Sequence, residues 1–399
     1  MIPFKELIDF EKAKEIIIEK TWEMKRVEEV DVTEACGRVL AEDIKAGFDI
    51  PGFSRAAMDG YAVIASDTFG ANQRNPVKLR IMGKIFAGEI ARREVKKGEC
   101  MQIATGAPLP EGSDAVVMVE NTSLEGEEVK IFKPVYPGAN VTPPDEDVKK
   151  GEMVLRKGDI LNPSKIGVLA ALGMRKVRVY EKPKVHLYPT GREIVSPGEK
   201  KEYGKIYDIN SYTLATLLKK EGASVEIHPI VDDEKEAIEK CIDEARGDYI
   251  IFSGGSSVGE RDIMADVVKK RGEIFFHGIA LKPGKPTIFG RVGNALIFGM
   301  PGYPTSCLTN AYVLLLPSIK KMARLPLKVE RKEAMLAEKI VSTIGRHQIY
   351  PVRVEQGKAY PVFKESGAIT SLSEATGYIE IPANVEYLEE GSQVLVNYF

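Results

Sequence analysis

The region from residue 180 to 325 constrains the fold most, because short apolar strand patterns alternate there with amphipathic helical patterns. Strands are predicted at 184–188, 224–231, 249–252, 285–290 and 295–299, and helices at 210–221, 233–245, 262–270 and after 306. This alternation is typical of a doubly wound α/β domain, with a parallel sheet between two layers of helices. Ligands of such domains bind where the parallel strands end.

Three turns lie at these predicted strand ends. Residues 253–259 read Ser-Gly-Gly-Ser-Ser-Val-Gly, a turn whose backbone N–H groups and following helix N-terminus favour phosphate. Residues 282–286 read Lys-Pro-Gly-Lys-Pro and present two lysines to an oxyanion, and residues 300–306 again precede a helix. Each turn alone is compatible with a purely structural role. Because strand ends of one sheet converge, the three together predict one anion site.

Acidic residues flank these turns, namely Glu193, Asp232, Asp233 and Asp262. Carboxylate oxygens are the ligands that Mg²⁺ prefers, especially beside bound phosphate. Each residue singly is also compatible with a helix N-cap or a solvated surface charge. The pattern therefore favours a magnesium site without fixing its ligands.

The remaining chain divides by pattern. Residues 1–45 are predicted to be helical, including a second amphipathic stretch at 32–44 that contains Gly37. Residues 47–140 alternate apolar and polar side chains between glycines and prolines, which predicts a small β-rich domain of hairpins. Residues 327–399 are rich in β-branched residues, which predicts a small β-barrel or sandwich.

Composition excludes several classes of protein. The 399 residues hold 56 Lys and Arg against 58 Asp and Glu, so no bulk positive charge predicts binding to nucleic acid or to a membrane surface. No apolar run approaches the ~20 residues that a membrane span needs. The four cysteines form no C-x-x-C motif, which argues against a disulfide framework and favours a reducing cytoplasm. The four histidines are far apart in sequence, and we expect them to be structural.

Seven segments, in order, resemble one family over essentially the whole chain: the molybdopterin molybdenumtransferases, the MoeA and gephyrin E-domain type. The segments are residues 57–62, 105–108, 189–193, 206–210, 253–259, 282–286 and 301–304. The resemblance implies an elongated homodimer whose subunit has four parts. These parts are an N-terminal helical and linker domain (1–46 plus 140–178), a β-rich domain (47–139), an α/β molybdopterin-binding-like domain (179–325) and a C-terminal β-barrel (326–399).

The resemblance also implies a reaction. The family takes adenylylated molybdopterin, releases AMP with the help of Mg²⁺, and inserts molybdate or tungstate, which is a substrate. It implies catalytic roles for Asp59, Thr105, Glu193 and Asp262, with Asp232 and Asp262 as Mg²⁺ ligands. It implies oxyanion binding by Lys282, Lys285, Arg346 and Arg353. It implies substrate and phosphate binding by Asp147, Ser253, Gly254, Gly255, Ser257, Gly259, Pro301, Gly302, Pro304 and Ser371. In the family, the residues matching Asp59 and Thr105 reach the cleft from the partner subunit.

The chain departs from the family pattern at Arg192, Ser256, Gly278 and Tyr303. These departures suggest a tungstate-using, archaeal-type subgroup, a hypothesis that comparable insertion rates for molybdate and tungstate would overturn. Two alternatives to the transferase remain. One is a neighbouring activity of the same α/β domain, either molybdopterin adenylylation or nucleotide hydrolysis. The other is a non-catalytic dimeric scaffold.

Overall fold

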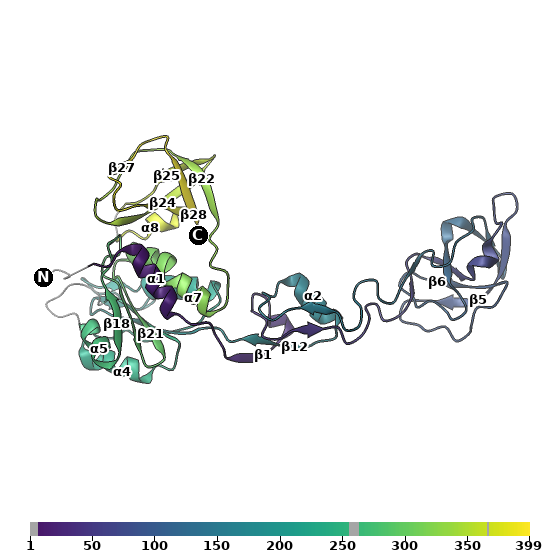
Figure 1. Cartoon of the computed structure of the whole chain (residues 1–399), viewed down its shortest axis with the longest axis horizontal. Coiled ribbons are helices and arrows are strands. Elements are labelled where there is room, and N and C mark those ends of the chain that lie inside the picture. The colour runs from purple at the N-terminus through teal and green to yellow at the C-terminus, as the bar shows by residue number, and fades with distance from the viewer. Residues whose placement is uncertain (1–6, 255–262, 365–366) are drawn as a thin grey trace. The chain divides into compact units, whose positions relative to one another are not determined.

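The structure is a computed structural model that describes residues 7–254, 263–364 and 367–399. The chain forms two compact units. The first comprises Met1–Glu29, Gly37–Val39 and Arg178–Phe399, and the second comprises Val30–Cys36 and Leu40–Val177. Figure 1 shows the elements of both units. Within the described ranges, no helix combines the length and the apolar character that a membrane span requires.

A six-stranded sheet forms the centre of the α/β domain in the first unit (Figure 1). Its strands, in spatial order, are β16 (Ser224–Ile227), β13 (Lys184–Pro189), β17 (Tyr249–Ser253), β21 (Ala295–Met300), β20 (Ile288–Val292) and β18 (Glu273–His277). Strands β16, β13, β17 and β21 are parallel, which confirms the predicted α/β fold. Residues of the central strands β17 and β21 alternate between the two faces of the sheet, and both of these faces are buried.

Helices cover both faces of this sheet. They are α1 (Phe10–Lys20), α3 (Asn210–Lys220), α4 (Lys235–Glu244), α5 (Ile263–Arg271), α6 (Pro304–Asn310) and α7 (Leu316–Met322), with a π-helical turn at Ala311–Leu315 before α7. On one face, α4 and α5 pack against Ile250, Phe252 and Ile297. On the other face, the hydroxyl of Tyr249 lies 2.7 Å from that of Ser318 in α7.

One expectation for the sheet is wrong. The strand predicted at 285–290 is β20, and it runs antiparallel to β21 and to β18. Only Gly293 and Asn294 separate the paired residues Val292 and Ala295. Two residues suffice for a hairpin, whereas a parallel connection needs a crossover of a dozen or more.

The C-terminal residues form a closed barrel of five strands, as predicted. The strands are β22 (Arg331–Leu336), β24 (His347–Glu355), β25 (Lys358–Pro361), β26 (Gly377–Ile381) and β28 (Gln393–Tyr398), and β24 pairs with both β25 and β26 to close the ring. Leu336, Val352, Ile379 and Val396 fill its core. Strand β19 (Leu281–Lys282) pairs with the start of β24, so the lysine-containing turn abuts the barrel.

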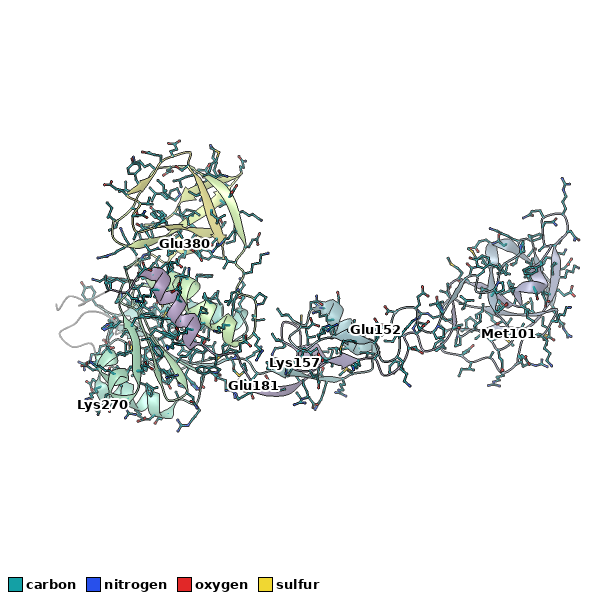
Figure 2. All side chains as sticks on the ribbon, viewed as in Figure 1. Met101, Glu152, Lys157, Glu181, Lys270 and Glu380 are labelled. Atoms are coloured by element: carbon teal, nitrogen blue, oxygen red, sulfur yellow. The ribbon has the colours of Figure 1, made fainter. Side chains whose placement is uncertain are left out.

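The second unit contains the predicted β-rich domain. Its six-stranded sheet has the order β7 (Ala115–Met118), β4 (Gly60–Val63), β6 (Glu99–Ile103), β5 (Val77–Ile85), β9 (Glu128–Ile131) and β8 (Thr122–Glu125). Both faces are covered: Tyr61 and Val117 belong to one core, and Met101 (Figure 2) and Val116 belong to the other.

The stretch at 32–44 does not form the helix that was predicted. Only a 3₁₀ turn at Val32–Glu34 is present, and Asp31 caps it by accepting a hydrogen bond from the Thr33 N–H. Gly37 has φ +79°, which is incompatible with a right-handed helix. The chain then extends, and β2 (Ile44–Lys45) pairs with β11 (Met153–Leu155). The second unit also contains the α-helix α2 (Pro163–Ala171).

Candidate active site

A cavity of about 580 Å³ lies where the parallel strands of the α/β sheet end. In register, Pro189 of β13 pairs with Ser253 of β17, and Ser253 pairs with Met300 of β21. The two short strands β14 (Ile194–Val195) and β15 (Ile206–Tyr207) and the start of α3 complete the wall. The predicted residues that line the cavity are Glu193, Ser253, Gly254, Pro301, Gly302 and Pro304. Other lining residues include Thr190, Asp208, Asn210, Asp233, Pro286 and Tyr303.

Gly254 lets the loop after β17 approach the loop after β13. Its φ is +106°, a value that residues with a side chain rarely adopt, and an added Cβ would lie 2.4 Å from the carbonyl oxygen of Thr190. A Cβ on Gly302 would lie 3.9 Å from the Cα of Gly254, so the loops after β17 and β21 also meet. This close approach leaves main-chain atoms rather than side chains at one wall of the cavity.

Asn210 and Asp208 anchor this wall. Neither was predicted as a site residue, although both lie in the matched segment 206–210. Asn210 is buried, and its amide donates a hydrogen bond of 2.9 Å to the carbonyl oxygen of Gly302. Its own Oδ1 has no hydrogen-bond partner among the described residues. Asp208 accepts a hydrogen bond from the Ser211 N–H and so caps the first turn of α3.

Two carboxylates, Glu193 and Asp233, lie at the cavity. Asp233 is half-buried, and within the described part of the chain its Oδ1 has no hydrogen-bond partner. Burial raises the pKa of Asp233, and the negative charge of Glu193 raises it further. The carboxylate of Glu193 folds over Gly191, where a Cβ would meet its oxygens at 2.8 and 2.9 Å. Together they form an electronegative corner whose oxygens suit a hard cation.

The other predicted acidic residues have different outcomes. Asp232 is exposed and is not among the residues that line the cavity. Its sequence neighbour Asp233 occupies that position instead. Asp262, Gly255, Ser257 and Gly259 lie outside the described residues. Their predicted roles therefore stay predictions.

Asn310 of α6 fixes the lysine-containing turn through hydrogen bonds. The Asn310 amide donates hydrogen bonds to the carbonyl oxygen of Gly284 (2.8 Å) and to the hydroxyl of Thr287 (2.7 Å). A Cβ on Gly284 would lie 2.2 Å from Asn310, so only glycine fits this turn. The Lys282–Pro283 peptide bond is cis. Asn310 lies far from the turn in sequence, and no local pattern pointed to it.

The two lysines are not among the residues that line the cavity. The ammonium group of Lys282 donates a hydrogen bond of 2.7 Å to the hydroxyl of Thr343, just before the barrel strand β24. Pro286 of the same turn does line the cavity, so the turn borders it.

The predicted anion-facing residues of the barrel lie outside the cavity wall as well. Arg353 on β24 pairs with Glu355 at 2.9 Å, and Arg346 is half-buried just before that strand. Ser371 is buried, and its hydroxyl accepts a hydrogen bond from the Lys364 N–H. A neighbouring segment of the C-terminal domain contacts the start of α6 beside the cavity, because the Thr305 hydroxyl donates a hydrogen bond to the carbonyl oxygen of Ala368 at 2.9 Å.

In the second unit, two predicted catalytic residues contact each other directly. The Asp59 carboxylate accepts hydrogen bonds from the backbone N–H (2.7 Å) and the hydroxyl (2.8 Å) of Thr105. The backbone bond, followed by the side-chain bond, lowers the pKa of Asp59. Asp147 is exposed, and its N–H donates to the carbonyl oxygen of Ile50. The two hydrogen bonds from Thr105 therefore hold Asp59 as an exposed, ionised carboxylate in one orientation.

Comparison with known proteins gives matches over most of the chain. Residues 8–173 match the MoeA N-terminal region (domain I and II), residues 187–321 match a probable molybdopterin binding domain, and residues 333–399 match the MoeA C-terminal region (domain IV). A putative molybdopterin biosynthesis protein from Methanocaldococcus jannaschii is 38% identical, over 98% of each chain. A molybdopterin molybdenumtransferase from Haemophilus influenzae is 37% identical, over 79% of this chain and 78% of the relative.

A solved structure supports the same assignment. The crystal structure of a molybdopterin biosynthesis MoeA protein from Pyrococcus horikoshii is 40% identical to this chain. It superposes with a TM-score of 0.86 over 98% of this chain and 99% of its own. The three matched regions, in this order, together with relatives at this identity and coverage, show that the chain belongs to the MoeA family.

Proposed function

We propose that the chain is a molybdopterin molybdenumtransferase. It would bind adenylylated molybdopterin, cleave the pyrophosphate linkage with release of AMP, and insert molybdate or tungstate. The observation that carries this proposal is the cavity at the carboxyl ends of β13, β17 and β21, where close-packed glycines face two carboxylates. Relatives from Haemophilus influenzae and Staphylococcus epidermidis carry the name of this enzyme.

The glycine wall would receive the pyrophosphate group. Side chains are excluded at Gly254 by the Thr190 carbonyl, so an anion can approach the main chain closely there. Asn210 keeps the facing segment at Gly302 in place, because its amide is bonded to that carbonyl. Gly255, Ser257 and Gly259 remain predicted phosphate-binding residues.

The cavity carboxylates fit Mg²⁺. Asp233 offers a buried oxygen without a hydrogen-bond partner in the described structure, and Glu193 offers a second hard donor on the same wall. When bound there, Mg²⁺ would screen the charge of the pyrophosphate and polarise a phosphoryl oxygen. We propose that Asp233 and Glu193 are the Mg²⁺ ligands. Asp232 and Asp262 remain predicted contributors.

The oxyanion would bind at the lysine-containing turn beside the cavity. Asn310 fixes the backbone of the turn from within the fold. The Lys282 ammonium donates one hydrogen bond to the Thr343 hydroxyl, and its other N–H groups could bind the oxyanion. Arg346 and Arg353 would add positive charge from the barrel, and Ser371 a further substrate contact.

Asp59, Thr105 and Asp147 would act from the partner subunit of a homodimer. Asp59 suits such a role because Thr105 holds its exposed carboxylate in one orientation. The elongated dimer and the four-part division of each subunit belong to this proposal. So does a cytoplasmic location, which the four free cysteines support.

A complementation experiment tests the shared site. Asp59→Asn and Glu193→Gln should each abolish most AMP release, because each removes one half of every site. Mixed and re-associated in equal amounts, they should recover about a quarter of wild-type activity, since half of the dimers then hold one intact site of two. No recovery, with heterodimers shown by native mass spectrometry, would contradict a site built from both subunits.

The activity itself is tested with untagged protein, adenylylated molybdopterin, Mg²⁺ and molybdate, by measuring AMP and active cofactor. Production of both is expected. ATP consumption with unadenylylated pterin would indicate the adenylyltransferase alternative. That alternative is not favoured, because the family matches extend well beyond the α/β domain on both sides. Absence of both turnover and binding would indicate a scaffold.

A further inference from the structure

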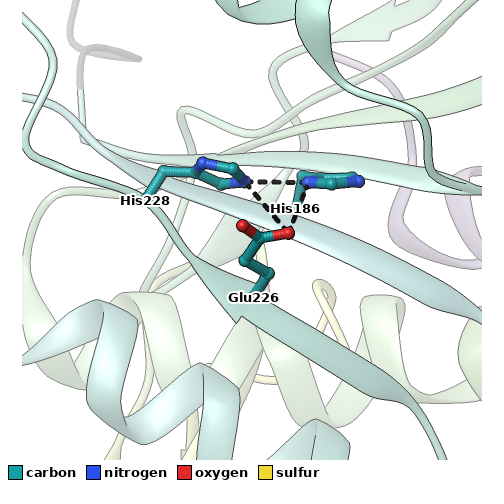
Figure 3. Close-up of side chains that lie close together, drawn as sticks. All are labelled: His186, Glu226 and His228. Carbon is teal, nitrogen blue, oxygen red and sulfur yellow. Dashed lines mark hydrogen bonds and ion pairs between the residues drawn. The ribbon is translucent and has the colours of Figure 1, made fainter.

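A second cluster of ligand-type side chains lies on the same sheet, outside the set of residues that line the cavity. It consists of His186 on β13, Glu226 on β16 and His228 directly after β16 (Figure 3). His186 and Glu226 are direct cross-strand partners, and β16 is the edge strand of the sheet. The sequence separation of 186 and 228 hid this proximity, because strand pairing alone brings the two histidines together.

The separations in this cluster match a metal site. Nδ1 of His186 lies 2.8 Å from Nε2 of His228. Oε2 of Glu226 lies 3.5 Å from the first nitrogen and 3.9 Å from the second. Tetrahedral Zn²⁺ with ligand bonds of about 2.0–2.2 Å sets its ligands roughly 3.3–3.6 Å apart. The three observed separations bracket that spacing, so small side-chain rotations suffice to enclose an ion.

The two imidazoles are held in place by their surroundings. His228 stacks on Tyr188, with 4.2 Å between ring centroids. His186 packs against Gly247, where a Cβ would lie only 2.5 Å from its ring. Glu226 is 64% exposed, which leaves the outer side of the cluster open to a water ligand.

We propose that His186, Glu226 and His228 bind a divalent transition metal of the zinc class. Two imidazole nitrogens and one carboxylate oxygen suit Zn²⁺, whereas Mg²⁺ prefers oxygen ligands alone. The bound ion would cross-link β13 to the segment after β16 and so stabilise the open edge of the sheet. The proposal is independent of the function of the cavity.

The test uses the full-length protein without a histidine tag, stripped with EDTA and titrated with Zn²⁺ by calorimetry. One Zn²⁺ per cluster is expected, and Mg²⁺ should not compete for it. His186→Gln and His228→Gln should each weaken binding by about 100-fold or more, and Glu226→Gln by about 10-fold. Zn²⁺ should raise the melting temperature of the wild type and not of the double variant His186→Gln/His228→Gln.

Matched controls come from β18, the opposite edge strand of the sheet. His277→Gln and Glu273→Gln change the same residue types there and should leave Zn²⁺ affinity unchanged. Circular dichroism of each metal-free variant checks that it folds. X-ray absorption at the zinc edge should show two imidazoles in the first shell.

Two results would overturn the proposal. The first is the absence of saturable Zn²⁺ binding by folded wild-type protein, which would leave the cluster as a hydrogen-bonded histidine pair. The second is binding that survives in His186→Gln and disappears in His347→Gln. That outcome would move the ion to the other cluster of potential ligands, Glu11, His347 and Glu380.

Discussion

Strand β13 contributes to two sites of opposite chemistry. Its carboxyl end borders a cavity built of main chain, glycines and carboxylates, which suits phosphate and a hard cation. Its middle carries His186, which with His228 and Glu226 suits a borderline metal. The cavity exists because several strands end together. The histidine cluster exists because two neighbouring strands lie in register. The two proposed metal sites therefore occupy separate places on one sheet.

The largest expected effect comes from closing the cavity wall. Gly254→Ala places a Cβ 2.4 Å from the Thr190 carbonyl oxygen at φ +106°, so one of the loops must shift. Misplacement of this size in a phosphate-binding loop should slow AMP release by about 10²-fold or more. Zn²⁺ affinity, measured by calorimetry, should not change.

Gly293→Ala is the matched control for this change. Gly293 also has a positive φ (+57°), but a Cβ there meets no atom within 4 Å. The control should cost about 1 kcal/mol of stability and leave AMP release within about twofold of wild type. Equal losses of activity in both variants would show that the effect at Gly254 is not local to the cavity.

A smaller effect should distinguish the two neighbouring aspartates. Asp233→Asn removes the carboxylate that lines the cavity and should lower kcat/KM for AMP release by about 10–100-fold, partly recovered by excess Mg²⁺. Asp232→Asn changes an exposed side chain and should have the weaker effect. A larger loss in Asp232→Asn would restore Asp232 as the principal Mg²⁺ ligand.

The pH dependence of the wild type follows from the same carboxylate. Burial, with the charge of Glu193, raises the pKa of Asp233 above the ordinary aspartate value. If the ionised form is the active one, AMP release must fall as the pH decreases through this raised value. The pH profile of AMP release by Asp233→Asn should lack this decline at low pH. An identical decline at low pH in the wild type and the variant would show that another group causes it.

The smallest expected effect is on stability. The raised pKa means that the folded state favours protonated Asp233. The stability that this protonated side chain contributes is therefore fully present below the unfolded-state pKa, and it is lost as the pH rises through the folded-state pKa. Asp233→Asn should therefore raise the melting temperature at pH 7 by about 1–3 °C. The gain should disappear at a pH below the ordinary aspartate pKa. A lower melting temperature at pH 7 would mean that the fold relies on this charge.

Local patterns in the sequence predicted much of this structure, and the exceptions have physical causes. Periodicity and glycines at strand ends predicted the α/β domain and the loops at Gly254 and Gly302. The hairpin of β20 and β21 departs from the predicted parallel sheet because only two residues connect its strands, too few for a parallel crossover. Asn210 and Asn310 act through contacts with Gly302 and Gly284, which are distant in sequence.

The histidine cluster lay beyond sequence reasoning for the same reason. His186 and His228 lie on either side of a helix, and only the register of β13 with β16 brings Glu226 opposite His186. Whether Asp232 or Asp233 lines the cavity depends on the backbone conformation just before α4, which no sequence pattern specifies. Strand periodicity predicts where a site forms, whereas pairing register and side-chain direction decide which residues form it.

The most direct test of the account is a crystal structure of the wild-type protein with adenylylated molybdopterin in the absence of Mg²⁺, which should slow turnover. We expect the pyrophosphate group to lie in the cavity against Gly254 and Gly302, with Glu193 and Asp233 beside it. Pyrophosphate bound away from the ends of β13, β17 and β21 would contradict the central claim that this cavity is the active site.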